Sequence, residues 1–415
     1  MILVQAYNIV VVDMAKEKVL VIGGGFAGVK AALALCNDDR FEITLLSSHD
    51  NFRYYPTLYH VATGGTRANA SIPLTSLFEG KNVSLKHGTA KTLDRKAKTI
   101  TTEDGEIYSY DSLILALGVI TNYFNIPGLK EFSYGIKSID EVEKLKAHLH
   151  EQLLNEHKPD LNYVIVGAGP TGIELAGALP DYLNRLMELH NIKNRTIHID
   201  LVEAAPRLLP RLPKDTSKQI EQRLKRKGIK LYLGQVVQGE TANQLTVNGK
   251  PIQSHTVIWT AGTANNQFFT ENNFVLTGNH KVATDIFLQA EPNIFVLGDN
   301  ANTPFSGLAQ TAVFDGLYVA NNLKRKADGK TMKSYGIHQP TTIIPVGEGW
   351  AAVNRGQLRI YGWLGWALRQ VADAWAFHDY EPWVQAGRQW LTYYGREETC
   401  QTCLENIGKE HLHTA

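Results

Sequence analysis

The sequence predicts an α/β protein with two Rossmann-like dinucleotide-binding domains, followed by a C-terminal segment of amphipathic helices. Two glycine-rich loops predict the domains, because each follows a run of apolar, β-prone residues and leads into a helical stretch. A strand, such a loop and a helix direct backbone N–H groups and the positive end of the helix at a pyrophosphate. Six of the seven tryptophans lie after residue 349, and they predict the C-terminal segment. One such loop also occurs as a plain turn, whereas two indicate a pair of dinucleotides brought face to face.

The first loop places Gly23, Gly25 and Gly28 in the GxGxxG positions. Two facing dinucleotides are the arrangement of a flavin supplied by a nicotinamide cofactor, so we expect FAD at this loop. The following strand, residues 41–46, should end in an acid that binds the ribose hydroxyls. Ser47 stands there instead, and its hydroxyl can bond a ribose but brings no charge.

Later segments complete the predicted FAD site. Asp299 follows a buried strand and should bond the ribityl or phosphate end of FAD, with a strand-end turn as the alternative. A helix that starts near Ala309 and Gln310 should face the N1/O2 edge of the flavin and favour its anionic reduced form. The expected FAD-binding residues are Gly23, Gly24, Gly25, Phe26, Ala27, Gly28, Ser47, Ser48, Thr57, Ala90, Gly118, Asp299, Ala309 and Gln310.

The second loop is expected to bind NADH. The strand over residues 196–202 ends in Glu203, whose carboxylate can accept from both ribose hydroxyls and repel a 2′-phosphate. Arg207, four residues further on, could weaken this preference over NADPH. The expected NADH-binding residues are Gly167, Gly169, Pro170, Thr171, Gly172, Glu174, Glu203, Ala261 and Gly262.

Glu174 lies on the helix behind the second loop, where the nicotinamide and flavin rings should meet. We expect it to be catalytic, as a polar contact to the nicotinamide or as a proton relay to the reduced flavin. The alternative is an acid near a helix N-terminus that is stabilised by the helix dipole.

These motifs, in this order, resemble the two-dinucleotide flavoproteins of the disulfide-reductase superfamily, and within it the type II NADH:quinone oxidoreductases. The resemblance extends roughly over residues 15–395 and is carried by residues 51–64, 121–128, 167–177, 203–210, 259–262, 298–299 and 309–310. It implies bound FAD, NADH as the donor, a membrane quinone as the acceptor and no proton pumping. It also implies that Ala309 and Gln310 lie at the flavin and quinone end, and that Glu174 is the catalytic acid.

Three residues depart from the family pattern. Phe314 replaces a second quinone-side glutamine, Ser47 replaces the ribose-binding acid, and Leu117 replaces a threonine before Gly118. These differences bear on the identity of the electron acceptor.

The three cysteines exclude related chemistries. Only Cys36 lies near the first loop, so a redox-active disulfide against the flavin has no second cysteine. Cys400 and Cys403 lie in the tail with His411 and His413, at a spacing that is short for a zinc module. We expect a frayed tail and no metal site, and the low cysteine content indicates a reducing compartment.

The C-terminal segment is expected to dock on a lipid surface. Leu364, Leu368, Val371 and Trp375 recur at helical spacing, and the residues that repeat it after Pro382 are Trp383, Ala386, Trp390, Leu391 and Tyr394. Short amphipathic helices with indole rings lie at the headgroup boundary. The alternatives are packing on the FAD domain and a homodimer seam. Residues 346–415 hold six basic and eight acidic residues, so basic charge does not assist docking.

Length and composition limit the remaining possibilities. The chain has 415 residues, of which 44% are hydrophobic and 20% charged, as in an ordinary multidomain globular protein. With 42 basic and 41 acidic residues, nothing indicates nucleic-acid binding. No apolar stretch approaches the roughly 20 residues of a spanning helix.

The expected domain boundaries follow from the motifs. Residues 1–13 make a poor signal peptide, so we expect an N-terminal extension with Met14 as the natural start. The FAD domain should comprise residues 14–125 and 291–345, and the NADH domain residues 126–290. Residues 346–415 should form the docking or dimerisation segment.

The sequence therefore predicts an NADH:quinone oxidoreductase, peripheral on the cytoplasmic face of the cell membrane, with Glu174 and Gln310 as its catalytic residues. One alternative is a soluble NAD(P)H-dependent flavoprotein reductase of a small redox protein. Another is a flavin-bound redox sensor with little turnover.

Overall fold

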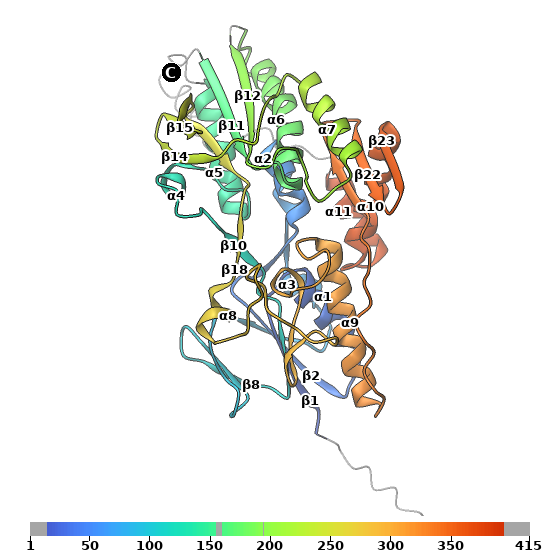
Figure 1. The fold of residues 1–415 in the computed structure, drawn as a ribbon. Coiled ribbons are helices and arrows are strands. Elements are labelled where there is room, and N and C mark those ends of the chain that lie inside the picture. The colour runs from blue at the N-terminus through green and yellow to red at the C-terminus, as the bar shows by residue number, and fades with distance from the viewer. Residues whose placement is uncertain (1–14, 155–159, 194, 394–415) are drawn as a thin grey trace, which may run out of the picture.

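Two α/β units lie one above the other, and the C-terminal segment lies along one side of both (Figure 1). The computed structural model describes residues 15–154, 160–193 and 195–393. The predicted residues 1–13, Tyr394, Cys400 and Cys403 lie outside the described residues.

The first unit is built on a six-stranded sheet in which only the edge strand β19 is antiparallel. The strands are, in spatial order, β19 (Gln289–Glu291), β20 (Ile294–Val296), β9 (Ser112–Leu115), β1 (Glu17–Ile22), β2 (Phe41–Ser47) and β5 (Ser84–His87). Helices α1 (Phe26–Leu35) and α9 (Ala309–Ala327) pack together. A Cβ atom on Gly316 would lie 2.4 Å from the carbonyl oxygen of Ala27, so glycine permits this close approach.

An antiparallel sheet and a short helix complete the first unit. The sheet consists of β6 (Ala90–Asp94), β7 (Thr99–Thr102) and β8 (Ile107–Ser109). Helix α8 (Gln267–Glu271) places Phe268 and Phe269 in the core beneath it.

The second unit has a four-stranded, fully parallel sheet. Its strands are β13 (Lys230–Leu233), β12 (Thr196–Glu203), β11 (Asp160–Val166) and β17 (Thr256–Trp259). Its longer helices are α5 (Ile139–Leu154), α6 (Pro170–Leu189) and α7 (Lys214–Arg226). Antiparallel strands β14 (Val237–Thr241), β15 (Gln244–Val247) and β16 (Lys250–Gln253) form a small additional sheet. The parallel sheets confirm the predicted α/β class with two Rossmann-like units.

The antiparallel strands β10 (Val119–Thr121) and β18 (Thr263–Asn265) connect the two units. The first lies close to the expected boundary at residue 125. The second lies well before the expected boundary at residue 290, because residues 266–290 pack with the first sheet. Phe268, Phe269 and Phe274 bury their rings in the core of the first unit. We therefore propose that the second domain boundary lies at β18. The sequence alone did not reveal which of the two cores these apolar residues join.

The C-terminal segment begins with a sheet rather than with helices. Strands β21 (Thr342–Pro345), β22 (Ala351–Arg355) and β23 (Leu358–Gly362) form an antiparallel meander, and α10 (Trp363–His378) and α11 (Trp383–Tyr393) follow it. Val346 and Ala352 pack in the core of the second unit. Phe377, Tyr380 and Ala386 pack in the core of the first. The segment thus joins the two units.

The remaining elements are short. They are β3 (Asn51–Arg53), β4 (Ser71–Pro73), α2 (Leu58–Ala62), α3 (Leu74–Leu77), α4 (Leu129–Phe132) and the 3-10 turns Tyr55–Thr57, Arg67–Asn69 and Gly298–Asn300. Helix α2 leaves the first unit and packs against α5 and α6 of the second. In the described ranges, no helix is long and apolar enough to cross a membrane.

Candidate functional site

The first glycine loop turns tightly between β1 and α1. Gly23 has a φ of +113°, and a Cβ atom there would lie 2.2 Å from the carbonyl oxygen of Ala116. A Cβ atom on Gly28 would lie 2.0 Å from the carbonyl oxygen of Gly23. Gly25, the N-cap of α1, is different, because no protein atom lies within 4 Å of the position of its Cβ. Protein packing explains the first two glycines, whereas the open space at Gly25 suits a pyrophosphate at the helix N-terminus.

The second loop repeats this geometry between β11 and α6. Gly167 has a φ of +104°, and a Cβ on Gly172 would lie 1.9 Å from the carbonyl oxygen of Gly167. Gly169, the N-cap of α6, again has no protein atom within 4 Å of its Cβ position. Each loop therefore leaves one glycine open toward a ligand.

A cavity of about 1040 Å³ extends from the first loop along the C-terminal segment. Twelve of the fourteen predicted FAD residues line it: Gly23, Gly24, Gly25, Phe26, Ala27, Ser47, Ser48, Ala90, Gly118, Asp299, Ala309 and Gln310. Gly28 and Thr57 do not line it. Gly28 packs on Gly23, and the buried Thr57 hydroxyl donates to the carbonyl oxygen of Tyr54 at 2.9 Å. The volume and the lining fit an extended dinucleotide.

Ser47 is engaged within its own turn. Its hydroxyl donates to the carbonyl oxygen of His49 at 2.7 Å and accepts from the His49 N–H at 3.2 Å. The single hydroxyl proton is therefore used inside the protein. Arg53 also lines this cavity and is a cation that the sequence analysis did not single out.

Asp299 lies at the carboxyl edge of the first sheet, where β20 ends. Its Oδ1 accepts from the N–H of Gly307 at 3.1 Å, and burial raises the pKa of its carboxyl group. Lys281 donates to the Asp299 carbonyl oxygen at 2.8 Å, so a cation stands beside it. The next residue, Asn300, donates to the carbonyl oxygen of Gly118 and accepts from its N–H at 2.9 Å. Asn300 thereby fixes the Gly118 loop against the Asp299 loop, a role that its sequence position did not reveal.

Helix α9 begins at Ala309, and Gln310 lies in its first turn. The Oε1 of Gln310 accepts from the N–H of Thr341 at 2.8 Å, which orients the amide group at the cavity wall. Phe314 does not line the cavity and instead stacks on His338 with ring centroids 4.9 Å apart. The replacement of a glutamine by Phe314 therefore adds an aromatic contact behind the site.

The predicted NADH residues gather at the carboxyl edge of the second sheet. Glu203 ends β12, and its carboxylate accepts from the N–H of Ala168 at 2.6 Å and from that of Ala205 at 2.8 Å. Two lone pairs remain on the carboxylate for ribose hydroxyls. Arg207 does not oppose Glu203, because it donates to Leu212, Pro210 and Ser217 within the following loop.

The rest of the predicted NADH set lies around this loop. Ala261 approaches Gly167, Gly262 follows it with a φ of +75°, and Pro170, Thr171 and Glu174 line the cavity. The second loop thus opens toward the first.

Glu174 belongs to a buried cluster of charges. Its Oε1 lies 3.6 Å from Nη1 of Arg369, and Nε of Arg369 donates to Oδ2 of Asp373 at 2.7 Å. All three residues are less than 10% exposed and line the cavity. Burial raises the pKa of Glu174 to about 8, although Arg369 opposes the shift. Burial likewise raises the pKa of Asp373.

Arg369 and Asp373 were not predicted as site residues. Their only signal in the sequence is a pair of opposite charges four residues apart within an otherwise apolar helix.

The other glycine-loop helix is also tied to the C-terminal segment. Lys30 lies two residues after Gly28, as Glu174 lies two residues after Gly172. Nζ of Lys30 donates to the carbonyl oxygen of Asp379 at 2.6 Å and lies 3.2 Å from its Oδ1. Matching positions of α1 and α6 thus carry a basic and an acidic side chain, and each is bound by α10 or by the residue after it.

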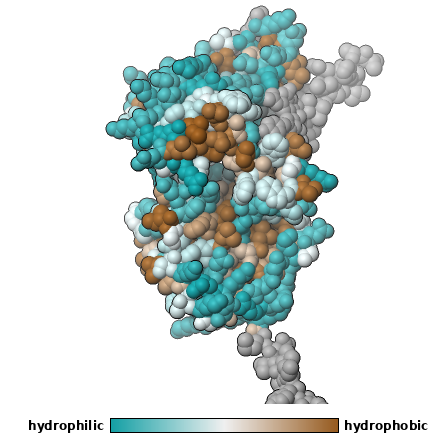
Figure 2. Space-filling view, turned by 90° about the vertical axis from the view of Figure 1, so that its right-hand side faces the viewer, coloured by the Kyte–Doolittle hydropathy of each residue, from teal (hydrophilic) through white to brown (hydrophobic). Residues whose placement is uncertain are grey.

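The far end of the cavity is apolar and open to the exterior. Leu358, Leu368, Val371 and Trp375 line it and are each more than 40% exposed. Figure 2 shows this side of the molecule, where hydrophobic residues gather beside a hollow. The α10 residues predicted as an apolar stripe therefore face outward, not onto the FAD domain. In α11, Trp383 and Leu391 are exposed, whereas Ala386 is buried.

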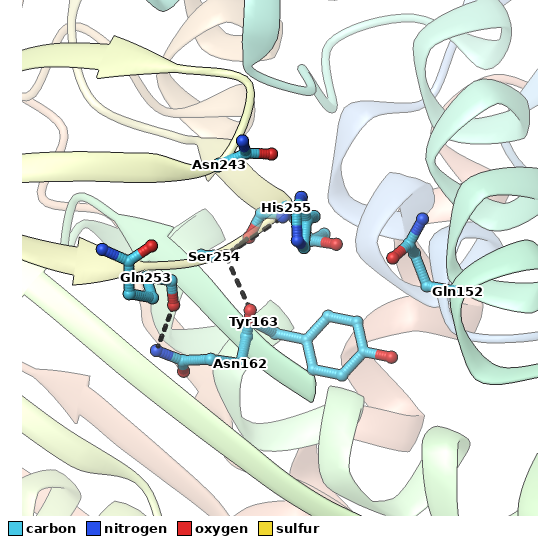
Figure 3. Close-up of a pocket in the computed structure, with 8 residues that line it drawn as sticks. Gln152, Asn162, Tyr163, Asn243, Gln253, Ser254 and His255 are labelled. Carbon is cyan, nitrogen blue, oxygen red and sulfur yellow. Dashed lines mark hydrogen bonds between the residues drawn. The ribbon is translucent and has the colours of Figure 1, made fainter. Parts of the chain in front are cut away.

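A second, smaller pocket of about 150 Å³ lies at the amino-terminal edge of the second sheet, opposite the glycine loop (Figure 3). It is lined by Gln152, Asn162, Tyr163, Asn243, Gln253, Ser254, His255 and Thr256. Its wall is held together locally, as Ser254 Oγ donates to the carbonyl oxygen of Asn162 at 2.6 Å. Within the described ranges, no group of three or more His, Cys, Asp or Glu side chains could hold a metal ion.

Comparison with known proteins agrees with this geometry. The sequence profile of the family described as "Pyridine nucleotide-disulphide oxidoreductase" matches residues 17–316. A type II NADH:quinone oxidoreductase of Staphylococcus saprophyticus is 27% identical over 355 residues, which are 80% of this chain and 88% of the relative. One of Staphylococcus epidermidis is 28% identical over 370 residues, or 84% and 90% of the two chains.

Solved structures with the same fold include NDH2 from Plasmodium falciparum in complex with NADH. It has a TM-score of 0.82 at 17% identity and covers 92% of this chain and 100% of its own. The sulfide:quinone oxidoreductase from Aquifex aeolicus has a TM-score of 0.76 at 18% identity and covers 88% and 91%.

Proposed function

We propose that this chain, which belongs to the pyridine nucleotide-disulphide oxidoreductase family, transfers a hydride from NADH to bound FAD and then two electrons to a membrane quinone, without pumping protons. One observation carries the proposal. A single cavity runs from the first glycine loop, past Glu174 of the second unit, to the outward-facing apolar residues of α10. A flavin, a nicotinamide and a lipid-soluble acceptor could all reach this one space.

The first unit supplies the groups that hold FAD. The N-terminus of α1 behind Gly25 would hold the pyrophosphate, and Asp299 would accept from the ribityl hydroxyls. The N-terminus of α9 at Ala309 favours negative charge at the flavin edge. The bound FAD supplies the redox chemistry, namely acceptance of a hydride and release of two electrons.

The second unit supplies the groups that hold NADH. The N-terminus of α6 behind Gly169 would hold its pyrophosphate, and Glu203 would accept from the adenosine ribose. Because Arg207 points into its own loop, Glu203 is left to repel a 2′-phosphate. This arrangement favours NADH over NADPH.

Glu174 and Gln310 act on the reacting groups. With its pKa raised to about 8, Glu174 holds a proton at neutral pH and can donate a hydrogen bond near the nicotinamide. The Oε1 of Gln310 is bound by Thr341, so the amide presents its Nε2 protons to a quinone carbonyl.

We further propose that the outer face of α10 docks on a lipid surface on the cytoplasmic side. Its exposed residues include Trp363, Leu364 and Trp375, and the cavity opens beside them. Quinones stay in the bilayer, so a mouth at this face shortens the path of the acceptor.

Lipid docking is tested by co-sedimentation with liposomes of a neutral lipid. Leu364→Glu places a charge on the exposed face of α10 but does not alter the cavity wall, so we expect at least a several-fold loss of bound protein. Val275→Glu, at an apolar residue of the first unit that is even more exposed than Leu364, is the matched control. Unchanged binding of Leu364→Glu would contradict lipid docking, and a change in sedimentation coefficient without lipid would instead indicate a homodimer seam.

The function is tested by anaerobic stopped-flow spectroscopy of the FAD-loaded protein. We expect NADH to bleach the flavin within milliseconds to seconds and menaquinone or ubiquinone to restore its colour. Reoxidation by a small redox protein alone would support the soluble reductase. A reduced flavin that persists with every acceptor would support the redox sensor, and failure of NADH to bleach the flavin would refute the proposal.

A further inference from the structure

The buried cluster around Arg369 contains more acid than base. One guanidinium faces two carboxyl groups, those of Asp373 at 2.7 Å and Glu174 at 3.6 Å. Nη1 of Arg369 also donates to the carbonyl oxygen of Ile343 in β21 at 3.3 Å. With both acids ionised, the cluster would carry a net negative charge in a site that excludes most water.

Such a charge is costly in a buried site, so the cluster retains a proton. Burial raises the pKa of both acids, and the Asp373 carboxylate further disfavours ionisation of Glu174. Arg369 of its own helix is the charged group bound to Asp373, Glu174 of α6 lies beside the same guanidinium, and β21 contributes a backbone carbonyl. The proton is therefore shared within this pair of acids.

The two acids occupy different parts of the cavity. Glu174 lies five residues after Gly169, the N-cap of α6, near the expected nicotinamide. Asp373 lies on α10 next to Ala372, and its neighbours Val371, Trp375 and Ala376 form the apolar end of the cavity. A lipid-soluble acceptor that enters from this end reaches α10, the helix that carries Asp373, whereas Glu174 lies on α6 of the second unit.

Resting on the proposed function, we propose that Asp373 is the residue that donates a proton to the quinone, and that Arg369 links it to Glu174. Conversion of a quinone to a quinol needs two electrons and two protons. The hydride from NADH brings two electrons and one proton, so one further proton is required. The proton that Glu174 holds at rest first moves to Asp373, so an O–H bond breaks on Glu174 and one forms on Asp373. The O–H bond of the Asp373 carboxyl group then breaks and a new O–H bond forms on the quinone oxygen. Asp373 is left as a carboxylate paired with Nε of Arg369, and a solvent proton from the cavity mouth restores it.

The test uses the FAD-loaded, full-length Asp373→Asn variant. Asparagine has the same shape and can still accept from Nε of Arg369, but it cannot donate a carboxyl proton. We expect flavin reduction by NADH to stay within twofold of the wild type. Reoxidation by quinone should slow roughly 100-fold and lose its solvent isotope effect, as for removal of a general acid. Asp373→Glu should restore part of the rate.

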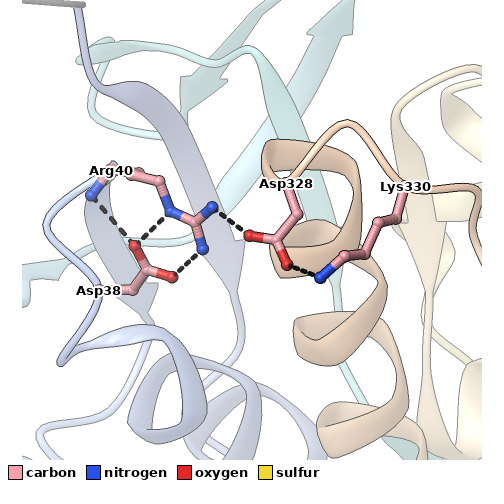
Figure 4. Close-up of polar contacts among 4 residues, drawn as sticks. All are labelled: Asp38, Arg40, Asp328 and Lys330. Carbon is pink, nitrogen blue, oxygen red and sulfur yellow. Dashed lines mark hydrogen bonds and ion pairs between the residues drawn. The ribbon is translucent and has the colours of Figure 1, made fainter.

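An infrared measurement gives a readout that is independent of turnover. At neutral pH the folded protein should show a protonated-carboxyl band that shifts in D2O, and Asp373→Asn should weaken it. The matched control is Asp328→Asn. Asp328 also accepts from a guanidinium, that of Arg40 at 2.6 Å, but in a surface network with Asp38 and Lys330 (Figure 4). The Asp328→Asn variant should leave the infrared band and the rates of both half-reactions unchanged.

The outcomes separate the two proposals. If the wild type is not reduced by NADH, or is reoxidised by no quinone, the proposed function fails. If the wild type passes both tests but Asp373→Asn is reoxidised at the wild-type rate, this inference alone is overturned. Equal slowing of both half-reactions, or loss of FAD from the variant, would make Asp373 a structural residue and would also overturn it.

Discussion

The two glycine loops have nearly the same backbone but different surroundings. In both, two glycines are required by contacts with the protein, and one, Gly25 or Gly169, is open to a ligand. The first loop faces a cavity that the C-terminal segment encloses, and the strand beside it ends in Ser47, which is bound to His49. The strand beside the second loop ends in Glu203, whose carboxylate is bound to the loop itself. We infer from this comparison that each loop binds a pyrophosphate, and we propose that its surroundings decide whether the cofactor is retained or exchanged.

The largest effect should come from filling the open glycine of each loop. Neither Gly25→Ala nor Gly169→Ala meets a protein atom within 4 Å, so both variants should fold. We expect Gly25→Ala to lose FAD, whereas Gly169→Ala should keep FAD and raise the KM for NADH at least tenfold, or about 1.4 kcal/mol. Flavin absorbance and steady-state kinetics measure these effects. Equal flavin content in the two variants, or a normal KM for Gly169→Ala, would contradict the assignment of the loops.

A second effect concerns Glu174, the acidic one of the two matched helix positions. Because the pKa of Glu174 rises from 4.5 to about 8 on folding, the unfolded chain loses this proton first. Stability therefore falls as the pH rises from about 4.5 to about 8, by up to roughly 1.4 kcal/mol per unit of pKa difference. Glu174→Gln should remove this pH-dependent contribution. The thermal unfolding midpoint of the variant should therefore rise relative to that of the wild type as the pH rises. A difference between the two midpoints that does not change with pH would contradict the buried, protonated acid.

A third effect concerns the ends of the two strands. Glu203→Gln removes the charge but keeps one acceptor, so the preference for NADH over NADPH should fall about tenfold, or about 1.4 kcal/mol. The ratio of kcat/KM for the two cofactors measures it. An unchanged ratio would show that Glu203 does not face the 2′ position of the ribose.

The smallest effect should come from Ser47→Ala. Because the hydroxyl is used by His49, we expect the rate of FAD loss to stay within twofold of the wild type. The variant should lose about 1 kcal/mol of stability, since the His49 backbone loses its partner. Rapid loss of FAD would show instead that Ser47 turns toward the ribose when FAD is bound.

The sequence by itself predicted the features that depend on local physics. The order of strand, glycine loop and helix gave two parallel sheets, because tight turns and close phosphate approach require glycine at particular positions. The apolar stripe of α10 was also predicted, because Leu364, Leu368, Val371 and Trp375 follow the helical period, whereas only the structure shows that it faces outward. Twelve of the fourteen expected FAD residues line one cavity, because the order of strand, loop and helix places them at one edge of the first sheet.

Only the tertiary structure decided contacts between residues far apart in the chain. Arg369 and Asp373 meet Glu174 across almost 200 residues of sequence, and Asn300 fixes Gly118 across a similar separation. No periodicity links such positions, because the packing of one unit on another brings them together. Packing likewise decided which of the two units residues 266–290 join. It also decided the direction in which Arg207 points. A sequence motif indicates which ligand a loop can bind, whereas the fold determines which charges surround that ligand and where its protons come from.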